Sequence, residues 1–521
     1  MKQLLFILLA VFSVSCASVR FTGAPLNTAT ATAKKAPLTD VQKKQWAHLD
    51  LLRDSIPGMS IQRAYDELIK GRKGDTVIVA VIDSGIDIEH PALASVIWTN
   101  EKEVPNNGID DDNNGYVDDI HGWNFLGNTE RENLEYIRLL RKETPGSERY
   151  KEFQEKSQSS LENSKNQLGM IGYLLDALPK SKDTIAAALG TTKFSLKEAK
   201  DFSPKSMAYM QALSIYELSV QQNISVPLLK KAKKQEESSL AAHHNIDFFG
   251  RTSVGDNPDD WNDWPYGDGN VIGPKKSGAE HGTHVAGIIA ARAGNGHQGI
   301  ARQVKIMVLR TVPDGDEYDK DIARAIRYAV NHGAKVINAS FGKPYSPHAN
   351  WVDDALRYAA KKDVLFISGS GNDGKNIDAS ENQSYPKDHY QNKEFVSNVI
   401  SVGATNASYD SSQIAPFSNY GKENVDLFAP GHAIWSTIPD GDYFFFDGTS
   451  MAAPAVTGVA AVLRSFYPKY SAEEIKSLLM SSGVPLFDEQ THDNTTATPK
   501  AFSKTGKLIN LYNALLAASK K

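Results

Sequence analysis

Short, unbroken runs of apolar residues mark several segments of the chain as strands. The runs at 76–83, 334–342 and 364–371 are rich in Val, Ile, Ala, Leu and Phe and do not alternate with polar residues. Because strands buried on both faces show this pattern, we predict parallel strands in the core of an α/β protein. Two later segments, after Gly282 and after Thr449, carry small residues at helical spacing, which favours helices that pack closely on a sheet.

Residues 129–244 show a different pattern. They are rich in Lys, Glu and Gln and have apolar residues at helical spacing. The prolines at 145, 179, 204 and 227 are interpreted as breaks between the helical runs. The pattern predicts three to five amphipathic helices that form a small inserted subdomain. This subdomain could serve as a lid, a docking surface or a spacer. The lysines at 230, 231, 233 and 234 are interpreted as a solvated helix face.

The amino terminus has the pattern of an export signal. One lysine precedes an apolar stretch too short to span a membrane, so residues 1–15 are predicted to be a signal peptide. Ser13-Val-Ser-Cys16 resembles a bacterial lipoprotein processing box, although Ser13 departs from its usual aliphatic residue. Cys16 is therefore predicted to be lipidated, with an ordinary signal peptide as the alternative. Residues 16–44 are predicted to be a flexible tether, with order beginning near Trp46.

Composition narrows the function classes. The chain has 521 residues, of which 41% are hydrophobic and 23% charged, values that allow a large core. The net charge of −5 argues against a general nucleic-acid binder. The single cysteine excludes an intramolecular disulfide framework and a Cys-rich zinc site.

Three segments carry residues typical of nucleophilic catalysis. Asp83 ends the first strand, His281 stands where a helix begins, and Ser450 follows a Gly-Thr turn before another helix. Taken singly, the Asp and Ser could be helix caps, and His284 is interpreted as a structural histidine. Together they suggest a serine nucleophile, a histidine base and an orienting carboxylate, in the chain order Asp, His, Ser.

The segments VIDSGID, HGTHVAG and GTSMAAP resemble the signature segments of the subtilisin-like serine proteases (subtilases, peptidase family S8). The resemblance implies a three-layer α/β fold with a central, mainly parallel sheet flanked by helices. It assigns 45–128 and 245–518 to the catalytic domain and leaves 129–244 as a helical insertion. It also implies that Asp83 orients His281, that His281 is the general base, and that Ser450 is the nucleophile.

The same resemblance implies further site residues. Asn372, in a Gly-rich turn after a buried strand, matches the asparagine of the family's oxyanion hole. Ser340, Phe341 and Gly342 match the strand that pairs with extended substrate, and Ser384 matches the base of the first side-chain pocket. These motif segments hold no obvious acidic residue, which favours apolar or mixed side chains at the cleavage site.

An acidic loop resembles part of a calcium site. Asp110, Asp112, Asn114 and Gly115 match the first half of an EF-hand-like loop, and Asp118 or Asp119 could close it. A structural calcium ion is predicted there, with a solvated acidic turn as the alternative. A second cluster, at Asp256, Asp259, Asp260, Asp263 and Asp268, is a weaker candidate for a cation. No cofactor is expected for catalysis.

The sequence thus predicts an exported bacterial endopeptidase that acts on proteins or peptides through an acyl-enzyme. It would be lipid-anchored at the cell envelope, or periplasmic or secreted. Two other classes remain open: a transpeptidase or peptide cyclase with the same triad, and a non-catalytic binding scaffold. No propeptide domain is apparent before the first strand, and the insertion is one hypothetical restraint on activity.

Overall fold

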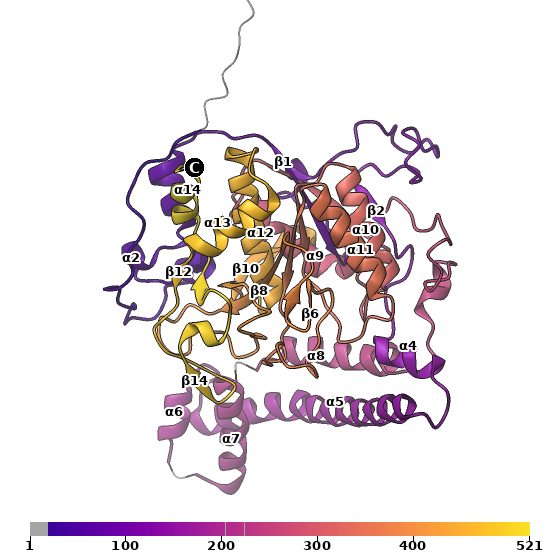
Figure 1. The fold of residues 1–521 in the computed structure, drawn as a ribbon. Coiled ribbons are helices and arrows are strands. Elements are labelled where there is room, and N and C mark those ends of the chain that lie inside the picture. The colour runs from indigo at the N-terminus through magenta and orange to yellow at the C-terminus, as the bar shows by residue number, and fades with distance from the viewer. Residues whose placement is uncertain (1–18, 204, 223, 521) are drawn as a thin grey trace, which may run out of the picture.

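The computed structural model describes residues 19–203, 205–222 and 224–520. Within them, nine strands form one sheet, mainly parallel, with helices on both faces (Figure 1). From one edge to the other the strands are β12 (Val484–Pro485), β15 (Lys507–Leu508), β9 (Leu427–Pro430), β8 (Val399–Thr405), β5 (Leu365–Gly369), β4 (Val336–Ala339), β1 (Val77–Asp83), β3 (Val304–Arg310) and β2 (Gly122–Asn124). The strands predicted from the unbroken apolar runs are β1, β4 and β5, at the centre of this sheet.

Alternate residues of β1 face two separate cores, which explains why the strand shows no polar positions. Val79 and Val81 belong to one core, and Ala80 and Ile82 belong to the other. The first core is covered by α9 (Glu280–Ala290), α12 (Thr449–Phe466), α13 (Ala472–Ser482) and α14 (Leu511–Ala518), and the second by α10 (Asp319–Asn331) and α11 (Ala349–Lys361). The three-layer α/β prediction is confirmed.

The carboxyl ends of the central strands meet at one edge of the sheet. Strand β1 ends at Asp83, β4 is followed directly by Ser340, and β5 runs into the turn that holds Asn372. Because these strands are parallel neighbours, residues far apart in the sequence come together there.

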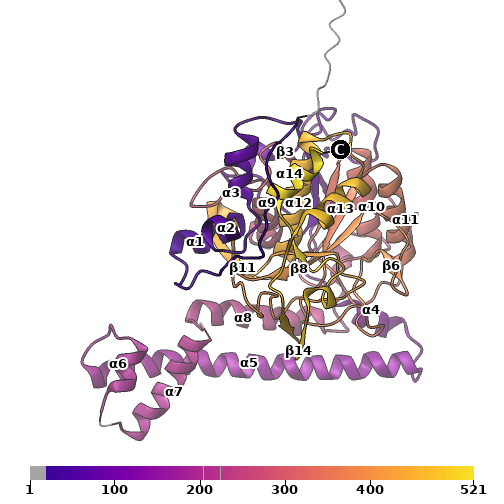
Figure 2. The same ribbon diagram turned by 60° about the vertical axis from the view of Figure 1, so that its left-hand side comes forward.

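The inserted residues form helices on one side of the domain (Figures 1 and 2). In the described part of the insertion these are α4 (Glu135–Lys142), α5 (Glu148–Leu189), α6 (Leu196–Asp201), α7 (Met207–Gln221), α8 (Val226–Ser238) and the π-helical turn η4 (Ser239–His243). The prediction of three to five helices agrees with α4 to α8. The expectation that Pro179 would separate two of them is wrong, because α5 continues through it for 42 residues.

The segment predicted to be a flexible tether instead packs on the domain. Phe21 is buried against Phe466, with ring centroids 5.4 Å apart, and the backbone N–H of Leu26 donates to Asn513 Oδ1 over 2.8 Å. A helix, α1 (Asp40–Gln45), precedes Trp46 and begins with a capping box formed by Thr39 and Gln42. Order therefore begins well before Trp46, because the segment has apolar and polar anchors of its own.

The remaining elements are short turns and hairpins. The helical ones are η1 (Trp46–His48), α2 (Leu51–Asp54), α3 (Ile61–Arg63), the π-helical η2 (Ala64–Ile69), η3 (Ala94–Val96), η5 (Gly250–Ser253), η6 (Lys276–Ala279), η7 (Pro439–Gly441) and η8 (Pro499–Ala501). The hairpins pair β6 (His389–Tyr390) with β7 (Lys393–Glu394), β10 (Ile434–Ile438) with β11 (Asp442–Phe446), and β13 (Gln490–His492) with β14 (Thr495–Ala497). No described helix is long and apolar enough to cross a membrane. The predicted signal peptide and Cys16 lie outside the described residues.

Candidate active site

Asp83 and His281 form a hydrogen-bonded pair. Asp83 Oδ1 lies 2.7 Å from His281 Nδ1 and also accepts the backbone N–H of Ser84. The Asp83 side chain is 2% exposed, whereas that of His281 is 37% exposed. A carboxylate at Nδ1 favours the tautomer with its proton on that nitrogen, which leaves Nε2 free to accept one.

Electrostatics favour the protonated form of His281. Burial lowers its pKa, but the charge of Asp83, the hydrogen bond to it and the charge of Glu280 together raise the pKa above its ordinary value. The second histidine of the segment behaves differently. His284 is buried on α9, with Nε2 3.1 Å from the carbonyl oxygens of both Ile434 and Phe444, and burial lowers its pKa to about 3. His284 is therefore structural, as the sequence predicted.

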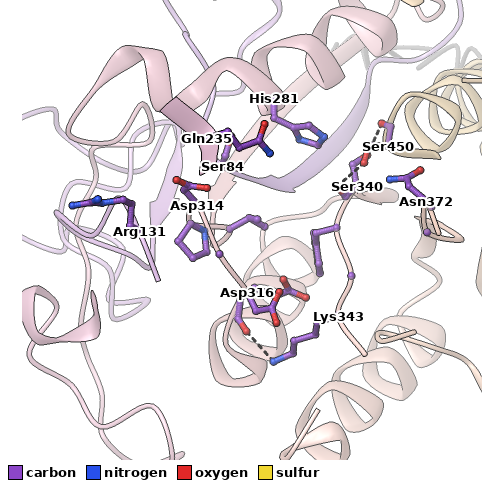
Figure 3. Close-up of a pocket in the computed structure, with 18 of the residues that line it drawn as sticks. Ser84, Arg131, Gln235, His281, Asp314, Asp316, Ser340, Lys343, Asn372 and Ser450 are labelled. Carbon is purple, nitrogen blue, oxygen red and sulfur yellow. Dashed lines mark hydrogen bonds between the residues drawn. The ribbon is translucent and has the colours of Figure 1, made fainter. Parts of the chain in front are cut away.

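Ser450 lies in the first turn of α12, after Gly448, which serves as the N-cap and has φ of 149°. A side chain at Gly448 would be strained in this conformation, so glycine suits the turn. The Ser450 hydroxyl donates to the carbonyl oxygen of Ser340 over 3.1 Å (Figure 3). Among the described residues, no hydrogen bond joins Ser450 to His281. A long or poorly aligned contact between nucleophile and base is common in sites without substrate.

The amide of Asn372 is held in one orientation. Its Oδ1 accepts the backbone N–H of Thr449 over 2.8 Å and the Thr449 hydroxyl over 3.0 Å. With the carbonyl oxygen engaged, the Nδ2 donors are the groups left to act on a ligand. Thr449 was not among the site residues predicted from the sequence. Its place beside Ser450 in the motif was the available signal.

The residues predicted to bind substrate also lie close together, and we call them the substrate edge. Ser340 Oγ donates to the carbonyl oxygen of Ser450 over 2.9 Å, which ties β4 to α12. Lys343 and Tyr385 exchange two backbone hydrogen bonds, of 3.1 and 2.9 Å. These bonds set the segment that holds Ser384 beside Gly342.

One cavity of about 2240 Å³ connects these residues. Its lining includes the following candidates from the sequence: His281, Ser340, Phe341, Gly342, Asn372, Ser384 and Ser450. Asp83 lies behind His281. The lining is mixed in charge and includes Glu381 and also Asp373, which directly follows Asn372.

Arg310 is a further residue that the sequence did not reveal. It ends β3 beside Asp83, and its guanidinium donates to the carbonyl oxygens of Ser84, Gly127 and Thr129. Burial lowers its pKa to about 10. Arg310 thus fixes the turn that follows Asp83. Its isolated position in the sequence gave no signal of this contact.

The acidic loop is arranged differently from its prediction. Oxygen atoms of Glu103, Asp110 and Asp112 lie within 4.8 Å of one another. Asp118 instead accepts the backbone N–H groups of Asn107 and Gly108, and the Asn114 amide donates to Asp119. Glu103 was missed because it precedes the motif. The second acidic cluster does not converge in the described chain: Asp256 pairs with Arg251 and Lys320, and Asp259 pairs with Lys142 and His348.

The family model for the subtilase family (Peptidase_S8) matches residues 74–504. The chain belongs to the subtilase family. It is 39% identical over 238 residues to the thermophilic serine proteinase of Bacillus sp. (strain AK1), a match covering 45% of this chain and 52% of that protein. It is 34% identical over 213 residues to subtilisin BL of Lederbergia lenta, covering 40% of this chain and 72% of that protein.

Other similar proteins match shorter shares of their length. The cell wall-associated protease of Bacillus subtilis (strain 168) is 41% identical over 202 residues, 38% of this chain and 20% of that protein. The matches thus span about half or less of the first two Bacillus relatives. Among solved structures, the crystal structure of a cold adapted subtilisin-like serine proteinase is 29% identical, with a TM-score of 0.36 over 45% of this chain and 74% of that one. The subtilase fold of this chain therefore rests on the family match and on its own sheet.

Proposed function

We propose that this subtilase is a serine endopeptidase that hydrolyses peptide bonds of proteins through an acyl-enzyme. The observation that carries the proposal is the 2.7 Å contact between Asp83 and His281, in a site whose cavity also holds Ser450 and Asn372. A binding scaffold has no need for a buried carboxylate that orients a half-exposed histidine beside a serine.

In the proposed reaction, Ser450 Oγ attacks the scissile carbonyl carbon while its proton passes to His281 Nε2. The Asp83 carboxylate stabilises the imidazolium that forms. The tetrahedral oxyanion accepts hydrogen bonds from Asn372 Nδ2 and the Ser450 backbone N–H. The C–N bond then breaks and the leaving amine takes the proton from His281. A water molecule, activated by the same histidine, releases the acyl group and regenerates the serine.

The substrate would lie as an extended strand along Ser340, Phe341 and Gly342. The side chain before the scissile bond would enter the pocket whose base is at Ser384. Asp373 and Glu381 at the cavity wall favour a mixed rather than a strictly apolar preference.

Casein, which is unstructured, is the first test. We expect the wild-type protein to cleave it and Ser450→Ala to leave it intact, because the acyl-enzyme is proposed to form on the Ser450 hydroxyl. Asn372→Ala should retain the fold and lose about 10²–10³ in kcat, the effect of removing one oxyanion-hole donor in subtilisin, a member of this family. Equal cleavage by the wild type and Ser450→Ala would overturn the mechanism. Mass spectrometry of the products separates hydrolysis from the transpeptidase alternative, which would join peptide ends.

A structural calcium ion is a separate proposal. Glu103, Asp110 and Asp112 would hold it, and Asp112 Oδ1 is a buried oxygen with no partner among the described residues. The ion would neutralise the carboxylates and stiffen the loop, with no part in the chemistry. We expect a calcium chelator to lower the Tm of the wild type and to leave that of Asp112→Asn unchanged. An equal Tm with and without chelator would exclude the site.

Export and lipid attachment at Cys16 are also proposed, from the signal-like amino terminus alone. Metabolic labelling with a fatty acid should mark the wild-type protein in a bacterial host and leave Cys16→Ser unlabelled. An unlabelled wild type that is still exported would support the ordinary signal peptide.

A further inference from the structure

The inserted helices share the active-site cavity with the catalytic residues. The wall opposite the sheet includes Lys230, Lys231, Lys234 and Gln235 of α8, and Arg149, Glu152 and Lys156 of α5. Figure 3 shows Gln235 in the same cavity as His281 and Ser450. In both ribbon views α8 lies between α5 and the protease domain. We call this pair of helices, α5 and α8, the roof.

One rim of the cavity supports the roof beside the catalytic histidine. Lys231 Nζ lies 3.0 Å from the carboxylate of Glu280, the residue before His281. The same ammonium group lies 5.1 Å from the ring centroid of Phe446 and 5.7 Å from that of Phe444. Lys231, interpreted from the sequence as part of a solvated face, therefore makes an ionic and a cation–π contact with the domain.

The other rim supports the roof beside the substrate edge. Tyr345 follows the segment that pairs with the Ser384 turn, and its ring packs at 5.2 Å against Phe153 of α5. Its hydroxyl lies 3.3 Å from Glu152 Oε1 and 3.4 Å from Lys156 Nζ. The amino-terminal part of α5 is thus fixed to the strand end that would hold substrate.

A third set of contacts holds the carboxyl end of α8 against the domain. Ser238 Oγ donates to Asp314 Oδ2 over 2.6 Å, and His243 Nε2 lies 2.9 Å from Asp314 Oδ1. Asp314 belongs to the loop after β3, which also lines the cavity. The roof therefore rests on three sides of the site and spans it.

We infer that the roof restricts the proposed endopeptidase to extended, unfolded polypeptide segments and excludes loops of folded proteins. The inference rests on the proposed function. A single extended chain needs only the space between the roof and the substrate edge. A loop on a folded protein must bring the surface beneath it toward Ser450, and that approach is occupied by α5 and α8. Lys231 is in this view a positioning residue for the roof, with no part in the chemistry.

The test compares one cleavage sequence in three settings. The sequence is taken from a site mapped in casein and presented as a short fluorogenic peptide, as a surface loop of a folded disulfide-bonded host protein, and as the same host after reduction and unfolding. We expect the peptide and the unfolded host to be cut readily. The folded host should be cut at least about tenfold more slowly, since a substrate that needs a minor open state binds in proportion to its population.

Two variants disturb the roof to different degrees: one removes it, and the other weakens one of its contacts with the domain. In one, a flexible glycine–serine linker replaces residues 148–237, which keeps α4 and η4. In the other, Lys231→Glu places a carboxylate against Glu280. The deletion should remove most of the difference between folded host and peptide. Lys231→Glu should raise the relative rate on the folded host about two- to fivefold, as expected when an exposed ion pair becomes a repulsion. Assays on the alkaline plateau of the pH profile keep the altered charge near His281 out of the comparison.

Lys233→Glu is the matched control. Lys233 is on the same helix, but its ammonium group lies 3.7 Å from Glu237 within α8 and it does not line the cavity. This variant should leave the ratio of the two rates unchanged. If the wild type cuts folded host and peptide equally, or if the variants shift both rates alike, the roof has no selective role. If the peptide resists cleavage by the wild type as by Ser450→Ala, the proposed function fails instead.

Discussion

The two ends of the insertion meet the protease domain in opposite ways. At α4, the side chains of Glu135, Arg138 and Lys343 are 2–5% exposed and form one ionic cluster, the α4 anchor. At α8, Lys231 and Glu280 are 53% and 35% exposed. A buried charge that loses its partner is costly, whereas an exposed pair contributes little. The α4 anchor is therefore part of the domain, and α8 rests on it.

The α4 anchor also reaches the substrate edge. Lys343 follows Gly342 directly, and its ammonium group lies 2.7 Å from Glu135 Oε2 and 2.9 Å from Asp319 Oδ1. Arg138 donates to the backbone carbonyl oxygens of Asp316 and Glu317 in the loop below. The first helix of the insertion thus supports the strand end that would bind substrate, although it lies outside the core predicted from the family motifs.

The strongest test of this contrast is Glu135→Ala. The change leaves Lys343 and Arg138 buried without one of their carboxylates, and we expect the free energy of unfolding in urea to fall by about 3–5 kcal/mol. The KM for peptide should rise as well, because the edge at Gly342 loses its support. Glu237→Ala, which breaks an exposed pair on α8, is the control and should cost less than about 1 kcal/mol. Similar losses from both variants would remove the distinction.

The carboxyl group of Glu135 should also make the stability of the folded protein depend on pH. Burial raises the pKa of Glu135, but the charges of Lys343 and Arg138 outweigh it and lower the pKa from 4.5 to about 2. The stability that Glu135 contributes is present above pH 4.5 and is lost as the pH falls toward 2. The difference in unfolding free energy between wild type and Glu135→Ala should shrink over this interval. A difference that stays constant with pH would contradict the assignment.

Glu317, beside the α4 anchor, should make stability depend on pH in the opposite direction. Burial raises its pKa from 4.5 to about 8; Lys343 opposes this rise, and Asp316 and Asp319 add to it. The folded state keeps a proton that the unfolded chain releases, so stability should fall as the pH rises from 4.5 to 8. Glu317→Gln should flatten this slope and gain on the order of a few kcal/mol at pH 8. Retention of the wild-type slope by Glu317→Gln would exclude Glu317 as its source.

What the sequence predicted well is local. Strand β1 ends at Asp83 as its apolar run predicted, and the motifs around His281 and Ser450 place both residues at helix starts. What it missed is non-local. Glu103 joins Asp110 and Asp112 only through the folded loop, and Phe21 finds its partner Phe466 at the far end of the chain.

Pro179 was misread for a related reason. A proline removes one helical hydrogen bond at a cost of about 3 kcal/mol, so it usually marks a helix end. In the structure, α7 and α8 pack along α5. Tertiary contacts of this kind can override a local preference. They cannot be found from a single sequence that shows no partner for the helix.

The smallest expected effect concerns the roof. Lys231→Ala should change the free energy of unfolding by less than about 1 kcal/mol, because both partners of its ion pair are partly exposed to solvent. In 1 M salt, where the screening length is about 3 Å, even this effect should vanish. The loss from Glu135→Ala should persist under the same conditions, because that cluster is closed to ions. If salt abolished both effects, the α4 anchor would be as exposed in solution as the roof, and the insertion would have to be treated as one loosely attached unit.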